Sequence, residues 1–405
     1  MSAIAESSAL AADDRLARRN AWVLAVAQAL AGGNNTVIAA TAGIIGAMLA
    51  PDKGLATLPV SVMVLGIWFG TLPLGYLAGR FGRRYALQTG SLVGALAGLV
   101  SCAAVLQASF PTFLLGTFGC GFYAAAHNTY RFAAADAASE DFRPRAISFV
   151  LAGGVLAAVI GPWVVIATKD LWPPYLFAAT FLAQSALAVL AGLVLTQFKT
   201  MPGVSRIEHE GGRPLGTIVR NPLFVVAAAC GVASYALMNL VMTSAPLAMV
   251  DCGHSVTDAA LGIQWHVLGM YAPSFVTGRL IHRFGVFRII ALGLALIALS
   301  GGIGIAGTAV GHFWLALTLL GIGWNFTFIG ATTLVTHCHR PAERTKVQAF
   351  NDFLIFGTMA LGSFASGKVL ATLGWEMLNG LLFPPLLAVG ALVAWHLLRR
   401  RAQAR

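Results

Sequence analysis

Charged residues are scarce in this 405-residue sequence. Asp, Glu, Lys and Arg together make up 10% of it, 58% of the residues are hydrophobic, and the mean hydropathy is +0.79. Soluble domains carry about 25% charged residues. A water-soluble globular fold is therefore excluded, because it would expose large apolar areas to water. The composition predicts an all-α membrane protein with several spans.

Acidic residues are rarer still, 15 against 26 basic ones, which gives a formal net charge of +11. Such a balance can indicate nucleic-acid binding. Here the basic residues lie in short segments between long apolar runs, which is the orientation bias of membrane proteins. The pattern predicts a lipid bilayer as the surroundings and no nucleic-acid partner.

Motifs of metal centres and enzymes are also lacking. The five cysteines show no CxxC spacing, so neither a zinc site nor a disulfide framework is predicted. The sequence has no phosphate-binding loop ending in Gly-Lys-Ser or Gly-Lys-Thr, no His-Glu-x-x-His and no Gly-x-Ser-x-Gly. We therefore expect neither an ATP-driven pump nor an enzyme.

Apolar runs long enough to cross a bilayer dominate what is present. A membrane-spanning helix needs about 20 apolar residues. The sequence predicts twelve such helices, at 20–46, 56–79, 84–107, 111–133, 144–168, 172–197, 221–249, 256–281, 286–308, 311–336, 346–370 and 375–398.

The basic residues orient these spans. All of them except Lys53, Lys169 and Lys368 fall in segments on one side of the predicted membrane. The positive-inside rule places that side, with both termini, in the cytoplasm. We expect a multi-pass protein of the bacterial cytoplasmic (inner) membrane.

The predicted spans form two halves. The polar segment 199–220 divides an N-terminal six-helix bundle, 1–198, from a C-terminal one, 221–405. Two stretches also recur: Gly75–Arg84 matches Gly278–Phe287 and lies at the same place in its half, between the second and third helices. Repeats of this kind are typical of transporters built around a central site.

Further matches support the repeat and its family. Gly119–Tyr123 matches Gly321–Asn325 in the fourth helix of each half. The loop after the second helix resembles the cytoplasmic signature of the major facilitator superfamily, through Gly75, Gly79, Arg80, Gly82, Arg83 and Arg84. The resemblance implies twelve helices in two pseudo-symmetric bundles, alternating access, and a gating role for this loop. Gly79 stands where the family pattern usually has Asp, so the charge contact of that Asp is not carried over.

Four side chains on the seventh and eighth spans form a candidate metal site. Met238 and Met242 are four residues apart, as are His266 and Met270, so each pair lies on one helix face. Antiparallel neighbouring helices would bring three thioethers and an imidazole together, and thioethers select Cu(I). A methionine pair alone is also ordinary core packing.

This pattern resembles the CcoA-type copper importers of the same superfamily. The resemblance maps these four residues onto the proposed metal positions, with Cys252 just beyond the seventh helix. It implies copper import for the assembly of cytochrome c oxidase, with copper as the transported ion and downstream copper-handling proteins as partners. A sister group is linked to riboflavin uptake, so the solute stays open.

Cys252 has a second interpretation. Together with His254 and Met249 it would capture an arriving ion; otherwise it is a loop thiol without a role. His127 and Asn128 on the fourth span either line the solute path or bond to a neighbouring helix.

Three acidic residues complete the candidates. Asp352 on the eleventh span is either a proton-coupling carboxylate or the partner of an arginine. Asp136 and Glu140 are expected to form gating salt bridges.

The function predicted is therefore a secondary transporter that imports copper by alternating access. The alternative is an importer of a small organic solute such as riboflavin. That solute would stack on Trp68, Trp265, Tyr271 and Trp324, with His127 and Arg131 as polar anchors.

Overall fold

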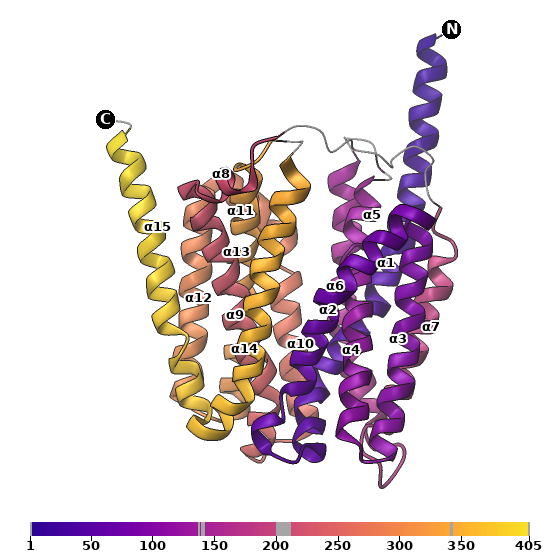
Figure 1. Ribbon diagram of the computed structural model, residues 1–405, viewed down its shortest axis with the longest axis vertical. Helices are drawn as coiled ribbons and strands as arrows, with labels where there is room; N and C mark the ends of the chain where they lie inside the picture. Colours follow the sequence, from indigo (N-terminus) through magenta and orange to yellow (C-terminus); the bar gives the residue numbers. More distant parts are fainter. Residues whose placement is uncertain (1, 137, 139–141, 200–211, 341–342, 404–405) are drawn as a thin grey trace. The chain divides into compact units, whose positions relative to one another are not determined.

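The computed structural model describes residues 2–136, 138, 142–199, 212–340 and 343–403 (Figure 1). Within those ranges the regular structure is helical, with no strand, which confirms the predicted all-α membrane fold. The elements are α1 (Ser2–Leu49), η1 (Lys53–Leu55), α2 (Leu58–Phe81), α3 (Arg83–Leu106), α4 (Phe110–His127), α5 (Tyr130–Asp136), α6 (Arg143–Thr168), α7 (Ala178–Leu195), α8 (Leu215–Val219), α9 (Pro222–Asp251), α10 (Val256–Tyr271), α11 (Ser274–Phe284), α12 (Val286–Ala306), α13 (Val310–Thr336), α14 (Arg344–Gly380) and α15 (Phe383–Gln403).

Every predicted span corresponds to a helix or a pair of helices. Among the described residues, nine continuous runs are long and apolar enough to cross a membrane. One of these runs, 350–399, contains most of the predicted span 346–370 and all of the predicted span 375–398. The helix turns between them at Gly374, whose φ of 77° is unfavourable for residues with a Cβ.

The two remaining predicted spans are interrupted in their second halves. The span 111–133 consists of α4 and α5, and at the break the Thr129 hydroxyl donates a hydrogen bond to the Ala126 carbonyl at 2.7 Å. The span 256–281 consists of α10 and α11, which meet at Pro273. Proline has no N–H to continue the helical hydrogen bonds.

Asn325 of α13 bonds to both sides of the α10–α11 break. Its Nδ2 donates to the Met270 carbonyl at 2.6 Å and to Ser274 Oγ at 2.7 Å. The Thr277 hydroxyl in turn donates to Asn325 Oδ1 at 2.6 Å. Such side-chain partners stabilise a helix break where water cannot reach it.

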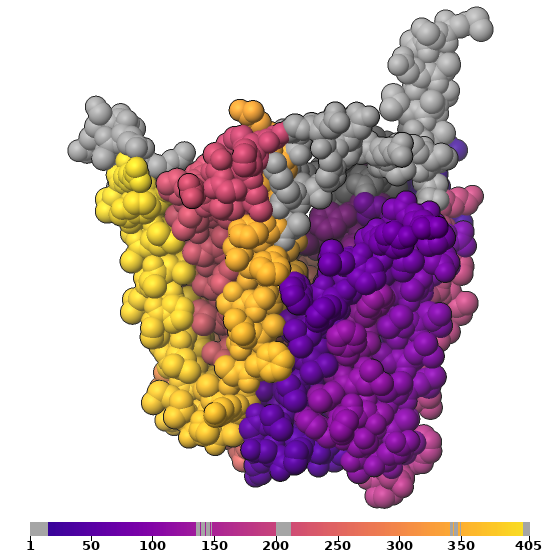
Figure 2. Space-filling model, in the orientation of Figure 1, coloured from indigo at the N-terminus to yellow at the C-terminus, as the bar shows by residue number. Residues whose placement is uncertain are grey.

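The chain divides into two compact units. Unit 1 contains Met1–Ala42 and Val62–Ile207, and unit 2 contains Gly43–Ser61 and Glu208–Arg405. The boundary near residue 207 falls inside the predicted linker. Unit 2 also holds the end of α1, η1 and the start of α2, and Figure 2 shows this indigo segment against the yellow and orange of α14.

The backbone of the two repeated loops is the same. Gly82 precedes α3 with φ 91° and ψ 156°, and Gly285 precedes α12 with φ 86° and ψ 146°. Only glycine adopts such a conformation without strain. The predicted match between Gly75–Arg84 and Gly278–Phe287 thus extends to the backbone of each loop.

Each unit contains one glycine crossing of the same kind. In unit 1, a Cβ added to Gly121 of α4 would lie 1.9 Å from the Met63 carbonyl oxygen of α2. In unit 2, a Cβ added to Gly321 of α13 would lie 2.3 Å from the His266 carbonyl oxygen of α10. Gly121 therefore occupies the place of Gly321, which shifts the predicted match of the two motifs by two residues.

We predict that Gly121→Ala and Gly321→Ala each destabilise their unit. The added methyl group meets a backbone carbonyl, which cannot turn away as a side chain would, at a cost of about 1–3 kcal/mol. Thermal unfolding in detergent should show a melting temperature lowered by several degrees. The control is Gly302→Ala on α12, where a Cβ meets nothing within 4 Å. Equal melting temperatures for all three variants would contradict the crossing.

Candidate functional site

The four predicted metal ligands lie in unit 2, and three of them are fully buried. Met238 on α9 is 3% exposed, His266 on α10 is 0% and Met270 is 8% exposed, while Met242 is half-buried against the same core. The helix α13 packs against both α9 and α10. These residues remain a predicted metal site, with His266 and Met270 on one face of α10.

His266 is oriented by the backbone of α13. Its Nδ1 lies 2.9 Å from the Leu317 carbonyl oxygen, which can only accept, so Nδ1 carries the proton. Its Nε2 is buried without a hydrogen-bond partner in the described structure. Within the described ranges, no three His, Cys, Asp or Glu side chains gather as a metal centre would need.

The predicted capture residues differ in their surroundings. Met249 is fully buried, and His254 Nε2 lies 2.6 Å from the Thr308 carbonyl oxygen. Cys252 is exposed just after α9. Partial burial, as the larger cause, and the Asp251 carboxylate, as the smaller one, raise the pKa of the Cys252 thiol above its usual value.

His127 ends α4 at the helix break in unit 1. Its ring lies edge-on to Tyr123 and Tyr130, with centroids 6.3 and 6.2 Å away. It is 5% exposed, and neither ring nitrogen has a hydrogen-bond partner among the described residues. Asn128 is exposed, and so is Asp352 on α14, whose two predicted roles, proton coupling or pairing with an arginine, stay predictions.

The predicted gating loop connects α2 and α3. A Cβ added to Gly75 or to Gly79 would have no neighbouring atom within 4 Å. The Arg80 guanidinium donates a hydrogen bond to the Tyr76 hydroxyl at 2.8 Å. Arg83 is half-buried and Arg84 exposed.

The predicted acidic gating residues lie largely outside the described structure. Asp136 ends α5, and its side chain lies outside the described residues, as does Glu140 altogether. Their predicted salt bridges therefore stay predictions.

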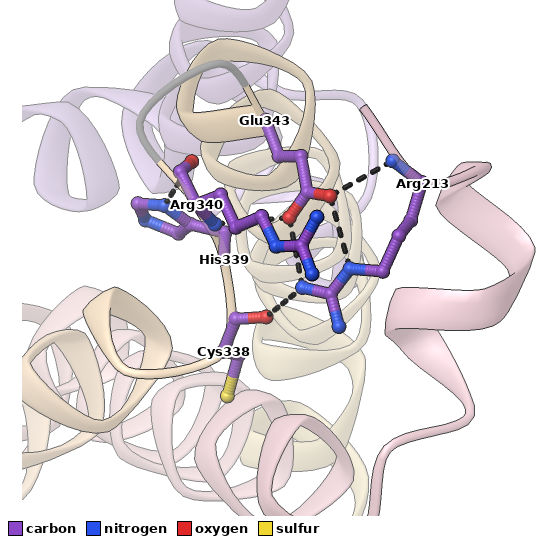
Figure 3. Close-up of polar contacts among 5 residues, drawn as sticks. All are labelled: Arg213, Cys338, His339, Arg340 and Glu343. Atoms are coloured by element: carbon purple, nitrogen blue, oxygen red, sulfur yellow. Dashed lines mark hydrogen bonds and ion pairs between the residues drawn. The ribbon is translucent and has the colours of Figure 1, made fainter. Parts of the chain in front are cut away.

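Sequence reasoning missed an ion pair between Arg213 and the buried Glu343 (Figure 3). Arg213 lies just before α8, and Glu343 lies just before α14. The Glu343 side chain is fully buried and accepts from Arg213 Nε at 2.9 Å and Nη2 at 2.8 Å. It also accepts from the backbone N–H groups of Arg213 and Arg340 at 2.8 and 2.9 Å. The Arg213 guanidinium donates further to the Cys338 carbonyl oxygen. These bonds hold the pKa of the Glu343 carboxyl well below its usual value.

The second half of α14 contributes to a buried cluster of hydroxyl groups, Thr57, Ser61, Ser363 and Ser366. Ser61 Oγ donates to Ser363 Oγ at 2.9 Å, and Ser366 Oγ donates to Thr57 Oγ1 at 3.2 Å. A Cβ added to Gly367 would lie 2.4 Å from Thr57 Oγ1. This hydroxyl cluster joins the start of α2 to α14 without any charge.

Four rings form an aromatic cluster in unit 2: Tyr235 on α9, Trp324 and Phe328 on α13, and Phe356 on α14. Trp324 and Phe328 are stacked, with centroids 5.0 Å apart and planes 14° apart. Tyr235 meets these two rings edge-on, at 5.1 and 4.9 Å, and Phe356 at 5.9 Å.

Only one predicted stacking residue, Trp324, belongs to this aromatic cluster. Trp68 and Trp265 are 40% and 43% exposed, and Tyr271 is half-buried. The four-residue spacing of Trp324 and Phe328 on one helix was the available sequence signal for the stacked pair.

The comparisons with known proteins decide the family. A model of the Major Facilitator Superfamily matches residues 24–351 and 227–405. The chain belongs to the major facilitator superfamily. It is also similar in fold to the solved D-xylose-proton symporter, with a TM-score of 0.72 at 18% identity over 92% of this chain and 96% of that one. The comparison with the solved nucleoside transporter NupG gives a TM-score of 0.71 at 14% identity, and it covers 94% of this chain and 99% of that one.

Two relatives within the superfamily are similar in sequence. The chain is 52% identical over 375 residues to the riboflavin transporter RfnT of Brucella anthropi, which covers 92% of this chain and 94% of that protein. It is 30% identical over 363 residues to the uncharacterized transporter YddS of Bacillus subtilis, which covers 84% of this chain and 83% of that protein. The chain is thus a transporter and not an enzyme. Neither relative supports the resemblance to copper importers, and the similarity to a riboflavin transporter favours the organic-solute alternative.

We predict that Glu343→Gln lowers the melting temperature, because it removes the carboxylate from the Arg213 guanidinium. The pKa of Glu343 is lower in the folded chain than in the unfolded chain. The ionised carboxylate therefore stabilises the folded chain fully above the usual glutamate pKa of about 4.3, and this stabilisation is lost as the pH falls below that value. The melting-temperature difference from the unchanged chain should be constant between about pH 6 and 8 and shrink below about pH 4.

The control for that measurement is Glu376→Gln, an exposed glutamate on α14. It should leave the melting temperature unchanged at every pH. A difference between Glu343→Gln and the unchanged chain that grows in acid would contradict the ion-pair account.

Proposed function

We propose that this chain imports riboflavin, or a closely similar flavin, across the bacterial cytoplasmic membrane. The observation that carries the proposal is the 52% identity to a riboflavin transporter over 92% of the chain. Sequences this similar over nearly their whole length share their fold and most of their interior, where a transported solute has to bind. Both termini are placed in the cytoplasm by the basic residues of the loops.

The interior of unit 2 supports an uncharged, planar solute. Its buried polar side chains include Asn239, Thr243 and Asn325, which are neutral, and the aromatic cluster provides four rings. A neutral solute avoids the high cost of a charge in a low-dielectric interior. Riboflavin is neutral at physiological pH and carries a flat ring system.

Copper remains the second candidate, and one observation favours it. His266 Nε2 is buried without a partner, and Met270 lies one helical turn away. An imidazole nitrogen and thioethers suit Cu(I). In that case the chain would supply copper-handling proteins of cytochrome oxidase assembly.

Paired uptake measurements separate the two solutes. Bacterial cells that depend on external riboflavin should accumulate labelled riboflavin at least about tenfold faster when they express this chain than when they carry an empty vector. Copper accumulation should be equal in the two strains and unchanged by Met242→Ala. Copper uptake that requires Met242, with riboflavin at background, would reverse the assignment.

Alternating access gives the hydroxyl cluster a role in transport. A carrier of this kind exposes its central site to one side at a time, so the segments that close one end have to separate during the cycle. Hydrogen bonds between hydroxyl groups are weak enough to break repeatedly, because each contributes only about 0.5–1.5 kcal/mol. We assign this closing contact to Ser61 and Ser363.

We predict that a disulfide at this contact stops transport. Ser61→Cys combined with Ser363→Cys, in a chain that also carries Cys252→Ser, places two sulfurs where the hydroxyl oxygens are 2.9 Å apart. Oxidation should abolish riboflavin uptake, and a reductant should restore it. The two single-cysteine variants, treated alike, serve as controls. Full uptake by chains shown to be cross-linked would contradict the assignment.

A further inference from the structure

We propose that the aromatic cluster binds the flat ring of the solute and that Trp324 and Asn239 hydrogen-bond to the edge of that ring. The inference rests on the proposed function and specifies where unit 2 would hold the flavin ring. It also assigns two edge groups of that ring, a carbonyl and the N–H, a partner of stated chemistry.

The rings are arranged to extend a stack. Trp324 and Phe328 lie nearly parallel, 14° apart, while Tyr235 stands at 81° and 80° to them. Tyr235, Phe328 and Phe356 are only half-buried, so each keeps part of its surface accessible. A flat ring placed against the cluster would stack on the parallel pair and meet the other rings edge-on, the two arrangements that aromatic groups prefer.

One hydrogen-bond donor beside these rings has no partner. Trp324 is 6% exposed, and its Nε1 makes no hydrogen bond within the described structure. A buried indole N–H usually has a partner, since leaving it unpaired is costly. A ligand that brings a carbonyl oxygen would supply one.

One acceptor on the neighbouring helix also has no partner. Asn239 is 1% exposed, and its Nδ2 donates to the Met359 carbonyl oxygen at 3.4 Å, while its Oδ1 accepts nothing from the described residues. Asn239 follows Tyr235 by four residues and Met359 follows Phe356 by three. The free amide oxygen therefore lies one helical turn from the aromatic cluster on α9.

A flavin matches this pair of groups. The pyrimidine edge of its ring presents a carbonyl, an N–H and a second carbonyl in sequence. The Trp324 N–H can donate to a carbonyl, and the Asn239 amide oxygen can accept from the N–H. One turn further along α9, the buried Thr243 hydroxyl also lacks a partner and suits the hydroxyl chain that flavins carry.

The fold does not require these rings. Because Gly121 occupies the place of Gly321, the positions of Trp324 and Phe328 in unit 1 are held by Ala124 and Asn128. Unit 1 forms the same helix crossing with a methyl group and an amide there. The aromatic side chains of unit 2 therefore serve something other than the crossing.

Binding of riboflavin to the purified full-length chain, followed by quenching of flavin fluorescence, tests the site. Trp324→Phe keeps an aromatic ring but removes the N–H and part of the indole surface, so the dissociation constant should rise about 3- to 10-fold. Tyr235→Leu should weaken binding by a similar factor through lost edge contacts. The control is Trp375→Phe, since Trp375 is also buried in unit 2 with an unpartnered Nε1, and it should leave binding unchanged.

A modified ligand tests Asn239 without relying on the variants' folding. Riboflavin methylated on the ring N–H should bind the unchanged chain more weakly than riboflavin does. Asn239→Leu should bind both ligands equally, because the partner of that N–H is already gone. Ring compounds lacking the hydroxyl chain should compete with riboflavin, and ribitol should not.

The outcomes separate the site from the function. If the unchanged chain binds riboflavin while folded Trp324→Phe and Tyr235→Leu chains bind it equally well, the site is wrong and the proposed function stands. If the methylated ligand binds the unchanged chain as tightly as riboflavin, the Asn239 contact is wrong. If the unchanged chain does not bind riboflavin, the proposed function fails, and the site fails with it.

Discussion

The lack of water in the hydrocarbon of a membrane is the constraint on which this structure depends. Backbone groups have to pair within the chain, so spans are helical, and helices gain contact with one another only by close packing. Gly121 and Gly321 provide that closeness, because each places its backbone directly against a carbonyl of a neighbouring helix. The crossing at Gly321 fixes α10 against α13, which brings the His266 ring to the Leu317 carbonyl.

The same constraint explains where the polar side chains are. At the α10–α11 break, the Met270 carbonyl accepts its hydrogen bond from the Asn325 side chain of α13. In contrast, Trp324 Nε1 and Asn239 Oδ1 remain unsatisfied within the described residues. Asn325 serves the fold and is paired, whereas Trp324 and Asn239 are the unpaired groups that we assign to the solute because they lie at the aromatic cluster.

Composition and periodicity were sufficient to predict the fold. Twelve apolar runs, the basic loops and the repeated Gly75–Arg84 stretch indicate two homologous bundles, and positive φ angles at both Gly82 and Gly285 agree with the repeat. The breaks inside the fourth and eighth spans were not predicted. A single Thr129 or Pro273 is also tolerated within continuous membrane helices.

The site was predicted less well, for a physical reason. Spacing along one helix shows which residues share a face, as it does for Met238 and Met242, but it does not show what that face meets. The aromatic cluster needs α9, α13 and α14 together, and the Arg213–Glu343 pair joins residues 130 positions apart. Contacts of this range depend on helix packing, which no local pattern encodes.

Exchange of labelled riboflavin in proteoliposomes tests the central claim most directly. Vesicles that contain only this chain and are loaded with unlabelled riboflavin should accumulate the labelled compound transiently from outside, and vesicles loaded with Cu(I) should not. Accumulation no greater than in protein-free vesicles, in a preparation whose chain is folded, would contradict the account of the protein as a flavin carrier.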